Sequence, residues 1–409
     1  MKILQINKFW RVRGGSERYV FELSRLLEER GHETIPFAMR DPANEPSPYS
    51  SLFVSPVELS DPYRLGLTQR LGTAARILRS REAGRNMSVL ADLTHPDVAH
   101  CHNIYHHLSP SILPPLQKRG IGIVMTLHDY KLMCPALRFY NGGGVCERCR
   151  PLHYGSCFSG KCVKGSRAAS LLCAVEMFYH DATKAYTGRI DRFIAPSRFM
   201  ADKLLERDVP PEKVVVIPNF IDTASWQPGE GERDYVLFAG RMSLEKGVET
   251  LIRAMAKLPD IPLKIAGTGM LEREYRTIAH ELGACNIEFL GFRSEEEIRR
   301  LTQGARFTAV PSEWYENAPM TILESFACGT PVVGARIGGI PELVREGQTG
   351  MLFEPGDITG LRRVIESLWD RSGPCAQMGA AARQLAEDEY SPATHYDKIL
   401  DVYQQVKRT

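Results

Sequence analysis

Short apolar runs alternate with amphipathic helical runs throughout the second half of the chain. In chain order the predicted elements are a strand at 235–239, a helix at 247–258, a strand at 263–266, a helix at 271–282, a strand at 287–290, a helix at 295–303, a strand at 307–310, a helix at 319–328 and a strand at 331–334. Parallel strands need crossover helices between them, so this order is typical of a doubly wound α/β sheet. In such sheets ligands bind at the carboxyl ends of the strands.

The first half of the chain shows the same alternation. It contains predicted strands at 1–7, 33–38, 97–101 and 122–127, with a helix at 16–30 after the first strand. A length of 409 residues suits two such domains. We therefore predict an α/β protein of two facing Rossmann-like, doubly wound domains, at 1–195 and 196–385. A helix over 386–409 is expected to cross back to the first domain, and the polar stretch 222–234 is the predicted hinge.

Charge is nearly balanced overall but unevenly placed. The formal net charge of +2 gives no reason to expect binding to nucleic acid. Residues 64–85 contain a single acid, Glu82, but six arginines: Arg64, Arg70, Arg76, Arg79, Arg81 and Arg85. This stretch predicts a basic amphipathic helix or pair of helices, either solvated or bound to an anionic membrane surface. No run of about eighteen apolar residues could span a bilayer, and Met1 leads directly into a strand. We expect a cytoplasmic protein, either free or peripheral on the inner face of the membrane.

Two motifs lie where strands are predicted to end. Gly14 and Gly15 precede the first helix, so backbone N–H groups there can approach an anion, although such a turn is also a common tight connection. Arg241 and Lys246 follow the first strand of the second half, in GRMSLEKG, next to a helix N-terminus. Two cations and a helix dipole suit a diphosphate, the alternative being solvated surface charges.

Two glutamates, Glu316 and Glu324, stand eight residues apart in ENAPMTILE. The first falls in a predicted loop and the second after about one turn of helix, so both can face a ligand. A carboxylate suits paired sugar hydroxyls, because each of its oxygens accepts hydrogen bonds. The pair could equally be structural, with Glu316 stabilising a helix N-terminus.

The motifs GGSERYV, LLEERGHE, GRMSLEKGVETLI, IAGTGMLE, IEFLGF, VPSEWYENAPMTILESFACGTPVVGARIGGIPELV and TGMLFEPGD occur in this order. Together they resemble the retaining nucleotide-sugar glycosyltransferases of the GT-B fold, whose E-x7-E motif matches Glu316 and Glu324 without a gap. The resemblance spans nearly the whole chain and is looser between residues 40 and 95. It implies that 1–195 is the acceptor domain and 196–385 the donor domain.

The resemblance also implies a role for each motif. Glu324 would hold the donor ribose, Glu316 would lie near the transferred sugar, and Arg241 with Lys246 would neutralise the diphosphate. The remaining implied donor contacts are Gly14 and Gly15 at the phosphate, Gly291 and Phe292 beside the base, and the backbone of Asn317, Ala318, Pro319 and Met320 at the sugar. His128, in LHD after a strand, matches the family's histidine near the sugar.

The implied reaction moves a sugar, with retention of anomeric configuration, from a nucleotide-diphosphate-sugar to a saccharide or lipid-linked saccharide acceptor. Bacterial surface polysaccharide synthesis is the expected setting. Preorganised cations stabilise the leaving diphosphate, and no Asp-x-Asp metal motif occurs in the donor half, so no catalytic metal is expected. Two alternatives remain: a nucleotide-sugar epimerase of the same architecture, and a regulator that binds nucleotide sugars without turnover.

A cysteine-rich, basic insert at 131–167 interrupts the first domain. Four cysteines, Cys146, Cys149, Cys157 and Cys162, fall within seventeen residues, and Cys134 precedes them. This crowding predicts a structural zinc held by the four thiolates, with Cys134 as an alternative ligand. An iron–sulfur cluster and simple reduced cysteines are the other interpretations. A similar insert after HDY occurs in some bacterial polysaccharide glycosyltransferases.

Overall fold

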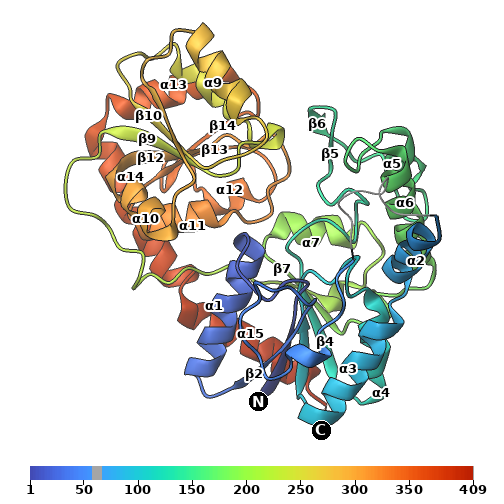
Figure 1. Cartoon of the computed structure of the whole chain (residues 1–409). Helices are drawn as coiled ribbons and strands as arrows, with labels where there is room; N and C mark the ends of the chain where they lie inside the picture. Colours follow the sequence, from blue (N-terminus) through green and yellow to red (C-terminus); the bar gives the residue numbers. More distant parts are fainter. Residues whose placement is uncertain (58–66, 409) are drawn as a thin grey trace. The chain divides into compact units, whose positions relative to one another are not determined.

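The computed structural model describes residues 1–57 and 67–408, which form two compact units (Figure 1). Unit 1 comprises Met1–Arg138, Glu147–Ile217 and Tyr396–Thr409, and unit 2 comprises Phe139–Cys146 and Pro218–His395. Arg64 of the predicted basic helix lies outside the described residues. Within the described part of the chain, no helix is both long and apolar enough to cross a membrane.

Unit 1 is built on a six-stranded sheet in which every neighbouring pair is parallel. From edge to edge the strands are β2 (Glu33–Phe37), β1 (Lys2–Ile6), β3 (Val98–Cys101), β4 (Gly122–Thr126), β7 (Arg192–Ala195) and β8 (Val214–Val216). The connecting helices include α1 (Gly15–Glu29), α2 (Leu67–Leu78), α3 (Arg81–Thr94), α4 (Leu113–Lys118), α6 (Arg167–Ala182) and α7 (Arg198–Leu205). The central strands β3 and β4 are buried along their whole length, as expected for a sheet covered on both faces.

Unit 2 contains a second six-stranded parallel sheet (Figure 1). Its strands, in spatial order, are β11 (Ile287–Gly291), β10 (Leu263–Ala266), β9 (Tyr235–Ala239), β12 (Ala305–Val310), β13 (Val332–Ala335) and β14 (Gly350–Phe353). Its helices include α8 (Val248–Met255), α9 (Glu272–Glu281), α10 (Glu295–Gly304), α11 (Met320–Ala327), α12 (Ile340–Leu343), α13 (Ile358–Trp369) and α14 (Ser372–Glu389). The predicted doubly wound α/β architecture is confirmed.

Apolar side chains pack on both faces of the unit 2 sheet. Val333 and Phe307 pack in one cluster with helices α8, α9 and α13, whereas Val332 packs in the other with α11, α12 and α14. Successive residues of a strand point to opposite faces, so adjacent valines of β13 serve different clusters. Each fully buried Val, Leu or Phe of this kind contributes about 1.5–3 kcal/mol.

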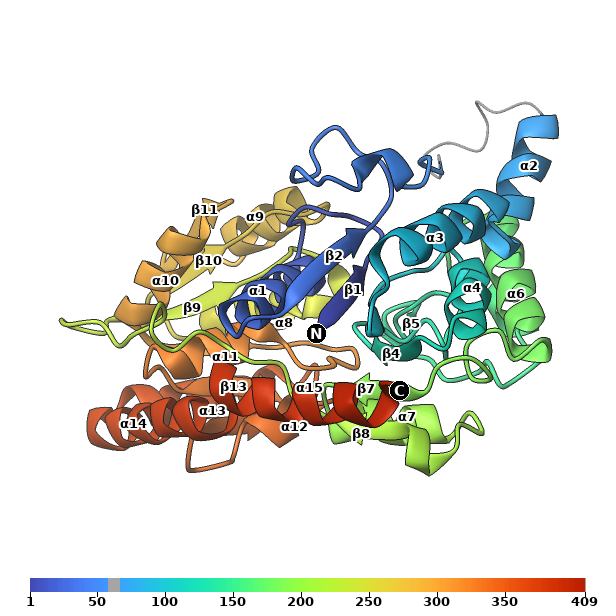
Figure 2. The ribbon, with the colours of Figure 1, turned by 90° about the horizontal axis from the view of Figure 1, so that it is seen from below.

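The last helix, α15 (Pro392–Val406), begins among residues of unit 2 and continues among those of unit 1 (Figure 2). Near its start, His395 Nδ1 lies 2.9 Å from the carbonyl oxygen of Pro218. Further along, the hydroxyl of Tyr403 lies 2.7 Å from His100 Nδ1 in strand β3. A Cβ on Gly122 would stand only 2.2 Å from the carbonyl oxygen of Val406, so glycine at the start of β4 gives this helix room.

The predicted boundaries differ from the structure. The last segment is predicted at 386–409, but unit 2 extends to His395 and the final helix begins at Pro392. The predicted hinge at 222–234 lies inside unit 2. The first domain does not end at residue 195, because strand β8 pairs with β7 (Phe193↔Val214) and residues up to Ile217 belong to unit 1. The insert 131–167 does not lie wholly in the first domain either. Its hairpin, β5 (Tyr140–Asn141) and β6 (Gly144–Val145), belongs to unit 2, where the Phe139 ring meets Tyr315 edge-on at 6.1 Å.

Candidate functional site

Three loops at the carboxyl ends of strands β9, β12 and β13 meet in unit 2 because two glycines allow close approach. Gly247 has φ +64°, and a Cβ there would lie 1.9 Å from the carbonyl oxygen of Pro311. Gly338 has φ +59°, and a Cβ there would lie 2.3 Å from the carbonyl oxygen of Glu316. The neighbouring Gly339 N–H donates to that same oxygen at 2.7 Å. The backbone on both sides of Glu316 and Lys246 is therefore fixed by contacts that tolerate no side chain.

Lys246 and Glu316 form an ion pair at this meeting point. The Lys246 Nζ lies 2.6 Å from Glu316 Oε1, and Ser312 Oγ donates to the same oxygen at 2.6 Å. Glu316 is only 5% exposed, whereas the Lys246 side chain is 23% exposed. Burial raises the pKa of the Glu316 carboxyl, but the charge and hydrogen bond of Lys246, together with other hydrogen bonds including that from Ser312, outweigh it and hold that pKa below its usual value. Glu316 is thus a carboxylate at neutral pH.

The other predicted residues of this half lie around the same edge of the sheet. Glu324 lies on helix α11 and is 7% exposed. Arg241 is exposed on the loop that follows β9. The carbonyl oxygen of Ala318 accepts a hydrogen bond from Asn219 Nδ2 at 3.1 Å. Pro319 is the N-cap residue of α11 and makes no side-chain hydrogen bond. The cap residue therefore leaves the first backbone N–H groups of that helix without a side-chain acceptor.

Two large apolar side chains are exposed on the loops after β10 and β11. Phe292 follows Gly291, which ends β11 with φ +72°, and its side chain is 74% exposed. Met270, in the loop after β10, is 95% exposed. Sequence reasoning singled out Phe292 but missed Met270, although the IAGTGM run after a strand was a signal. Exposed apolar groups at strand carboxyl ends offer a flat contact surface for a ring system.

His128 of unit 1 ends a chain of polar contacts that sequence reasoning did not foresee. Its Nε2 lies 3.0 Å from His102 Nδ1, and His102 Nε2 lies 2.9 Å from Gln5 Oε1. Because Gln5 Oε1 can only accept, His102 Nε2 donates to it and His102 Nδ1 accepts from His128 Nε2. That arrangement leaves His128 Nδ1 as an acceptor. The spacing of His100 in β3 and His102 just after it was the signal available in the sequence.

Burial sets the charge of this histidine chain. It lowers the pKa of His128 to about 3, and it lowers that of His102 well below the ordinary value, with the nearby histidines adding to the effect. The Tyr19 ring packs edge-on against His128, at 5.2 Å between ring centres. Both imidazoles are therefore neutral near pH 7.

Gly14 and Gly15 stand at the start of helix α1. Gly14 is the N-cap residue with extended backbone (φ −168°), which any residue can adopt, and no side chain caps the helix. The glycine pair is therefore not required by backbone conformation. Because Gly14 has no Cβ, no side chain at the cap position covers the backbone N–H groups in the first turn of α1.

The cysteines of the insert fall in both units. Cys149 and Cys157 are buried in an apolar cluster with Tyr154 of unit 1, against which Cys162 packs. Cys134 is also buried in unit 1, whereas Cys146 belongs to unit 2. The zinc on Cys146, Cys149, Cys157 and Cys162 stays a prediction. Among the described residues, the group of metal-binding side chains whose donor atoms all lie within 4.8 Å of one another is His106, Cys173 and Glu176.

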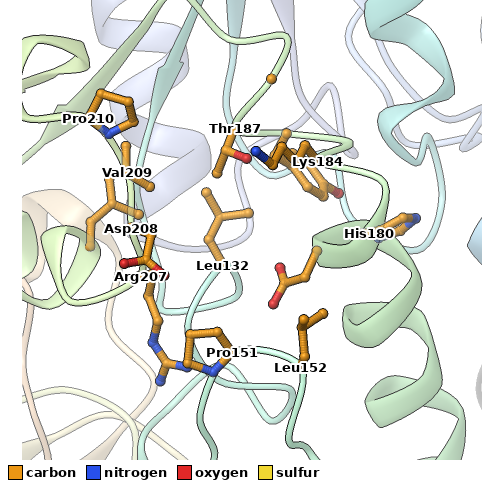
Figure 3. A pocket seen from close by; sticks show the side chains of 14 residues that line it. Leu132, Pro151, Leu152, His180, Lys184, Thr187, Arg207, Asp208, Val209 and Pro210 are labelled. Atoms are coloured by element: carbon orange, nitrogen blue, oxygen red, sulfur yellow. The ribbon is translucent and has the colours of Figure 1, made fainter.

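A cavity of about 440 Å³ lies in unit 1, beside the insert (Figure 3). Its charged lining balances two cations, Lys184 and Arg207, against two acids, Asp181 and Asp208. Leu132, Pro151 and Leu152 contribute an apolar wall. Tyr154 donates a hydrogen bond to Asp181, which ties the insert to helix α6 at the cavity. This balanced lining gives no preference for an anionic ligand.

Comparison with known proteins identifies the family. Residues 13–225, more than half of the chain, match the family described as Glycosyltransferase Family 4, and residues 220–385 match Glycosyl transferases group 1. The chain belongs to Glycosyltransferase Family 4. The predicted resemblance to GT-B glycosyltransferases is confirmed.

Curated relatives match about half of the chain. The D-inositol 3-phosphate glycosyltransferase of Mycobacterium sp. (strain KMS) is 32% identical over 214 residues, 48% of this chain and 48% of that protein. Glycogen synthase of Mycobacterium tuberculosis (strain ATCC 25618 / H37Rv) is 32% identical over 235 residues, 53% of this chain and 55% of that protein. The chain thus spans about half the length of the curated relatives that it matches.

Solved structures match over nearly the whole chain. HepE of Anabaena, crystallised with UDP and glucose, is similar with a TM-score of 0.69 and 19% identity, over 99% of this chain and 100% of that one. Sucrose-phosphate synthase from Thermosynechococcus elongatus is similar with a TM-score of 0.71 and 20% identity, over 99% and 98%. At these identities the likeness shows the fold, which is GT-B with two Rossmann-like sheets.

Proposed function

We propose that this member of the family transfers a sugar from a nucleotide-diphosphate-sugar to a saccharide or lipid-linked saccharide, with retention of anomeric configuration. The observation that carries the proposal is the ion pair between partly exposed Lys246 and buried Glu316 at the carboxyl ends of strands β9 and β12. It puts a cation and a carboxylate where open α/β sheets bind ligands. The structural neighbour HepE, crystallised with UDP-glucose, supports a donor of this class.

The donor would lie along the carboxyl edge of the unit 2 sheet. Arg241 and Lys246 bind the diphosphate, together with the N-terminus of helix α8, which has no side-chain cap. Glu324 accepts hydrogen bonds from the ribose hydroxyls. Phe292 and Met270, both exposed, contact the base.

The sugar would lie at the start of helix α11. Backbone groups from Asn317 to Met320 contact its hydroxyls, and Glu316 accepts a hydrogen bond from one of them. The phosphate then competes with Glu316 for Lys246. Since the Lys246 side chain is partly exposed while Glu316 is buried, the ammonium group can turn toward the ligand without breaking the Ser312–Glu316 hydrogen bond.

Bond cleavage places growing negative charge on the leaving diphosphate. Preorganised cations and helix N-terminal N–H groups stabilise that charge without reorganisation, so the proposed centre needs no metal ion. Gly14 and Gly15, at the uncapped start of helix α1 in unit 1, would offer backbone N–H groups to a donor phosphate.

His128 would act as a neutral hydrogen-bond acceptor near the transferred sugar. Its Nε2 is committed to His102, so Nδ1 is the nitrogen left to accept a hydrogen bond from a sugar hydroxyl. His102 is then a positioning residue, since it fixes the tautomer of His128 rather than contacting the sugar.

The acceptor is proposed to be a precursor of a bacterial surface polysaccharide at the inner face of the membrane. Two structural neighbours are named for related roles: WaaB is a lipopolysaccharide outer core galactosyltransferase, and WaaG a glycosyltransferase involved in lipopolysaccharide biosynthesis. Arg79, Arg81 and Arg85 are exposed around the start of helix α3, as a surface for anionic lipid requires. Arg76 is instead paired with Glu82 at 3.3 Å.

One experiment separates this function from its two alternatives. Purified protein is screened for thermal stabilisation by UDP-, GDP- and ADP-sugars, and the stabilising donor is then incubated with and without a bacterial lipid extract. Transfer of labelled sugar to lipid supports the proposal. Interconversion of the sugar without transfer would identify an epimerase, and binding without any turnover a regulator.

A further inference from the structure

We propose that His106, Cys173 and Glu176 form a binding site for a zinc-class divalent ion in unit 1. None of these three residues belongs to the proposed sugar-transfer site. His106 lies in the loop after strand β3, and the other two lie on helix α6, directly after the cysteine-rich insert. Such a site would tie the helix that follows the insert to the central sheet.

The donor atoms already stand close to coordinating positions. One donor atom from each residue lies within 4.8 Å of the others, and His106 Nδ1 is 3.1 Å from Glu176 Oε2. Bond lengths of about 2.0–2.3 Å in a tetrahedral zinc site put ligand atoms about 3.3–3.7 Å apart. Cys173 and Glu176 are three residues apart on one helix, so they share a face. Small side-chain adjustments are enough to complete the geometry.

Glu176 supplies an independent observation. Its carboxylate is fully buried; Oε2 accepts a hydrogen bond from Lys131 Nζ at 2.7 Å, but the buried Oε1 has no hydrogen-bond partner. A buried carboxylate oxygen without a partner is costly, and a metal ion would satisfy it. Lys131 would stay on Oε2 as the outer partner that orients a ligating carboxylate.

Charge and donor type decide the class of ion. A thiolate from Cys173 and the Glu176 carboxylate cancel the two charges of a divalent ion, so the buried Lys131 faces a formally neutral complex. Sulfur and imidazole nitrogen favour zinc over calcium or magnesium, which prefer oxygen ligands. Three protein ligands leave a fourth position for water, and the His106 side chain is 20% exposed, which gives the ion access.

The test measures metal content and cobalt spectra of the full-length protein, without an activity assay. After anaerobic reconstitution with zinc, elemental analysis is expected to find about one zinc bound at this site in each chain. Replacing zinc by Co²⁺ is expected to give a sulfur-to-cobalt charge-transfer band and the intense visible bands of tetrahedral cobalt.

Four variants locate the ion. Cys173→Ser and His106→Gln are each expected to bind one zinc fewer per chain than the wild type and to lose the charge-transfer contribution of this site, and both keep the buried Lys131–Glu176 ion pair. Cys285→Ser, which changes an exposed cysteine of unit 2, is the matched control and keeps the zinc and the charge-transfer band. If Cys157→Ser alone abolished zinc binding while Cys173→Ser and His106→Gln kept it, the thiols of the insert would hold the ion. That result, or a reconstituted wild type free of zinc, would overturn the proposal.

Discussion

Lys246 Nζ lies 2.6 Å from Glu316 Oε1, although the two residues are seventy positions apart in the sequence. Each was predicted to contact a different part of the donor, the lysine the diphosphate and the glutamate the sugar. If the donor binds as proposed, a phosphate contact of Lys246 would replace its contact with the Glu316 carboxylate. The two roles are therefore coupled, and a change in either residue alters the electrostatics of the other.

The proposed ribose contact predicts a defect in binding rather than in turnover. Glu324→Gln keeps the shape of the side chain but removes its charge, and a ribose contact is the same in the ground state and in the transition state. The donor KM should rise while kcat stays near the wild-type value. Steady-state kinetics at saturating acceptor measure both constants. Glu281→Gln, on the exposed surface of helix α9 in the same unit, is the control. A kcat lowered as much as kcat/KM would contradict the ribose assignment.

The neutral state of His128 predicts how stability depends on pH. Burial holds its pKa at about 3 in the folded protein, whereas an unfolded histidine titrates near 6.5. Below pH 6.5 the unfolded chain therefore binds more protons, and the free energy of unfolding falls toward pH 3, by up to about 1.4 kcal/mol for each pH unit from this residue. Urea denaturation between pH 4 and 7 measures the slope.

His128→Gln should flatten that slope, and His280→Gln, at an exposed position, should leave it unchanged. An unchanged slope in His128→Gln would show that His128 is not a buried neutral group. Above pH 6.5 neither variant should alter the pH dependence of stability, because the histidine is then neutral in both states.

The exposed arginines predict salt-sensitive binding to membranes. Arg79, Arg81 and Arg85 should attract vesicles that contain anionic lipid, and the attraction should weaken as salt shortens the Debye length from about 10 Å at 0.1 M. Co-sedimentation at low and high salt measures it. A triple change of these arginines to glutamine should abolish the salt-sensitive part. Equal binding to neutral vesicles would instead indicate that these arginines are solvated and do not bind anionic lipid.

The helices and strands of unit 2 could be predicted because each one follows from the pattern of apolar residues within its own segment. Buried parallel strands read as continuous apolar runs, and the predicted strands 235–239 and 263–266 coincide with β9 and β10. The end of the first domain was placed at 195 rather than 217, because the short strand β8 completes the sheet only through pairing with β7. That pairing leaves no periodic signal of its own.

The side-chain contacts of the candidate site were harder to predict. The residues themselves, Lys246 and Glu316 among them, were found through motifs, but their ion pair depends on loops brought together by Gly247 and Gly338. The chain from Gln5 through His102 to His128 likewise joins strand β1 to the segments that follow strands β3 and β4. Contacts of this kind come from tertiary structure, which residue spacing does not encode.

The most direct test of the account is steady-state kinetics on Lys246→Ala and Arg241→Ala, with Lys257→Ala, an exposed lysine after helix α8, as the control. Negative charge on the diphosphate grows during bond cleavage, so each of the two variants should lose about 10²-fold in kcat, while Lys257→Ala should match the wild type. Circular dichroism confirms that each variant is folded. If Lys246→Ala and Arg241→Ala both kept the wild-type kcat and KM, the assignment of the donor site would be contradicted.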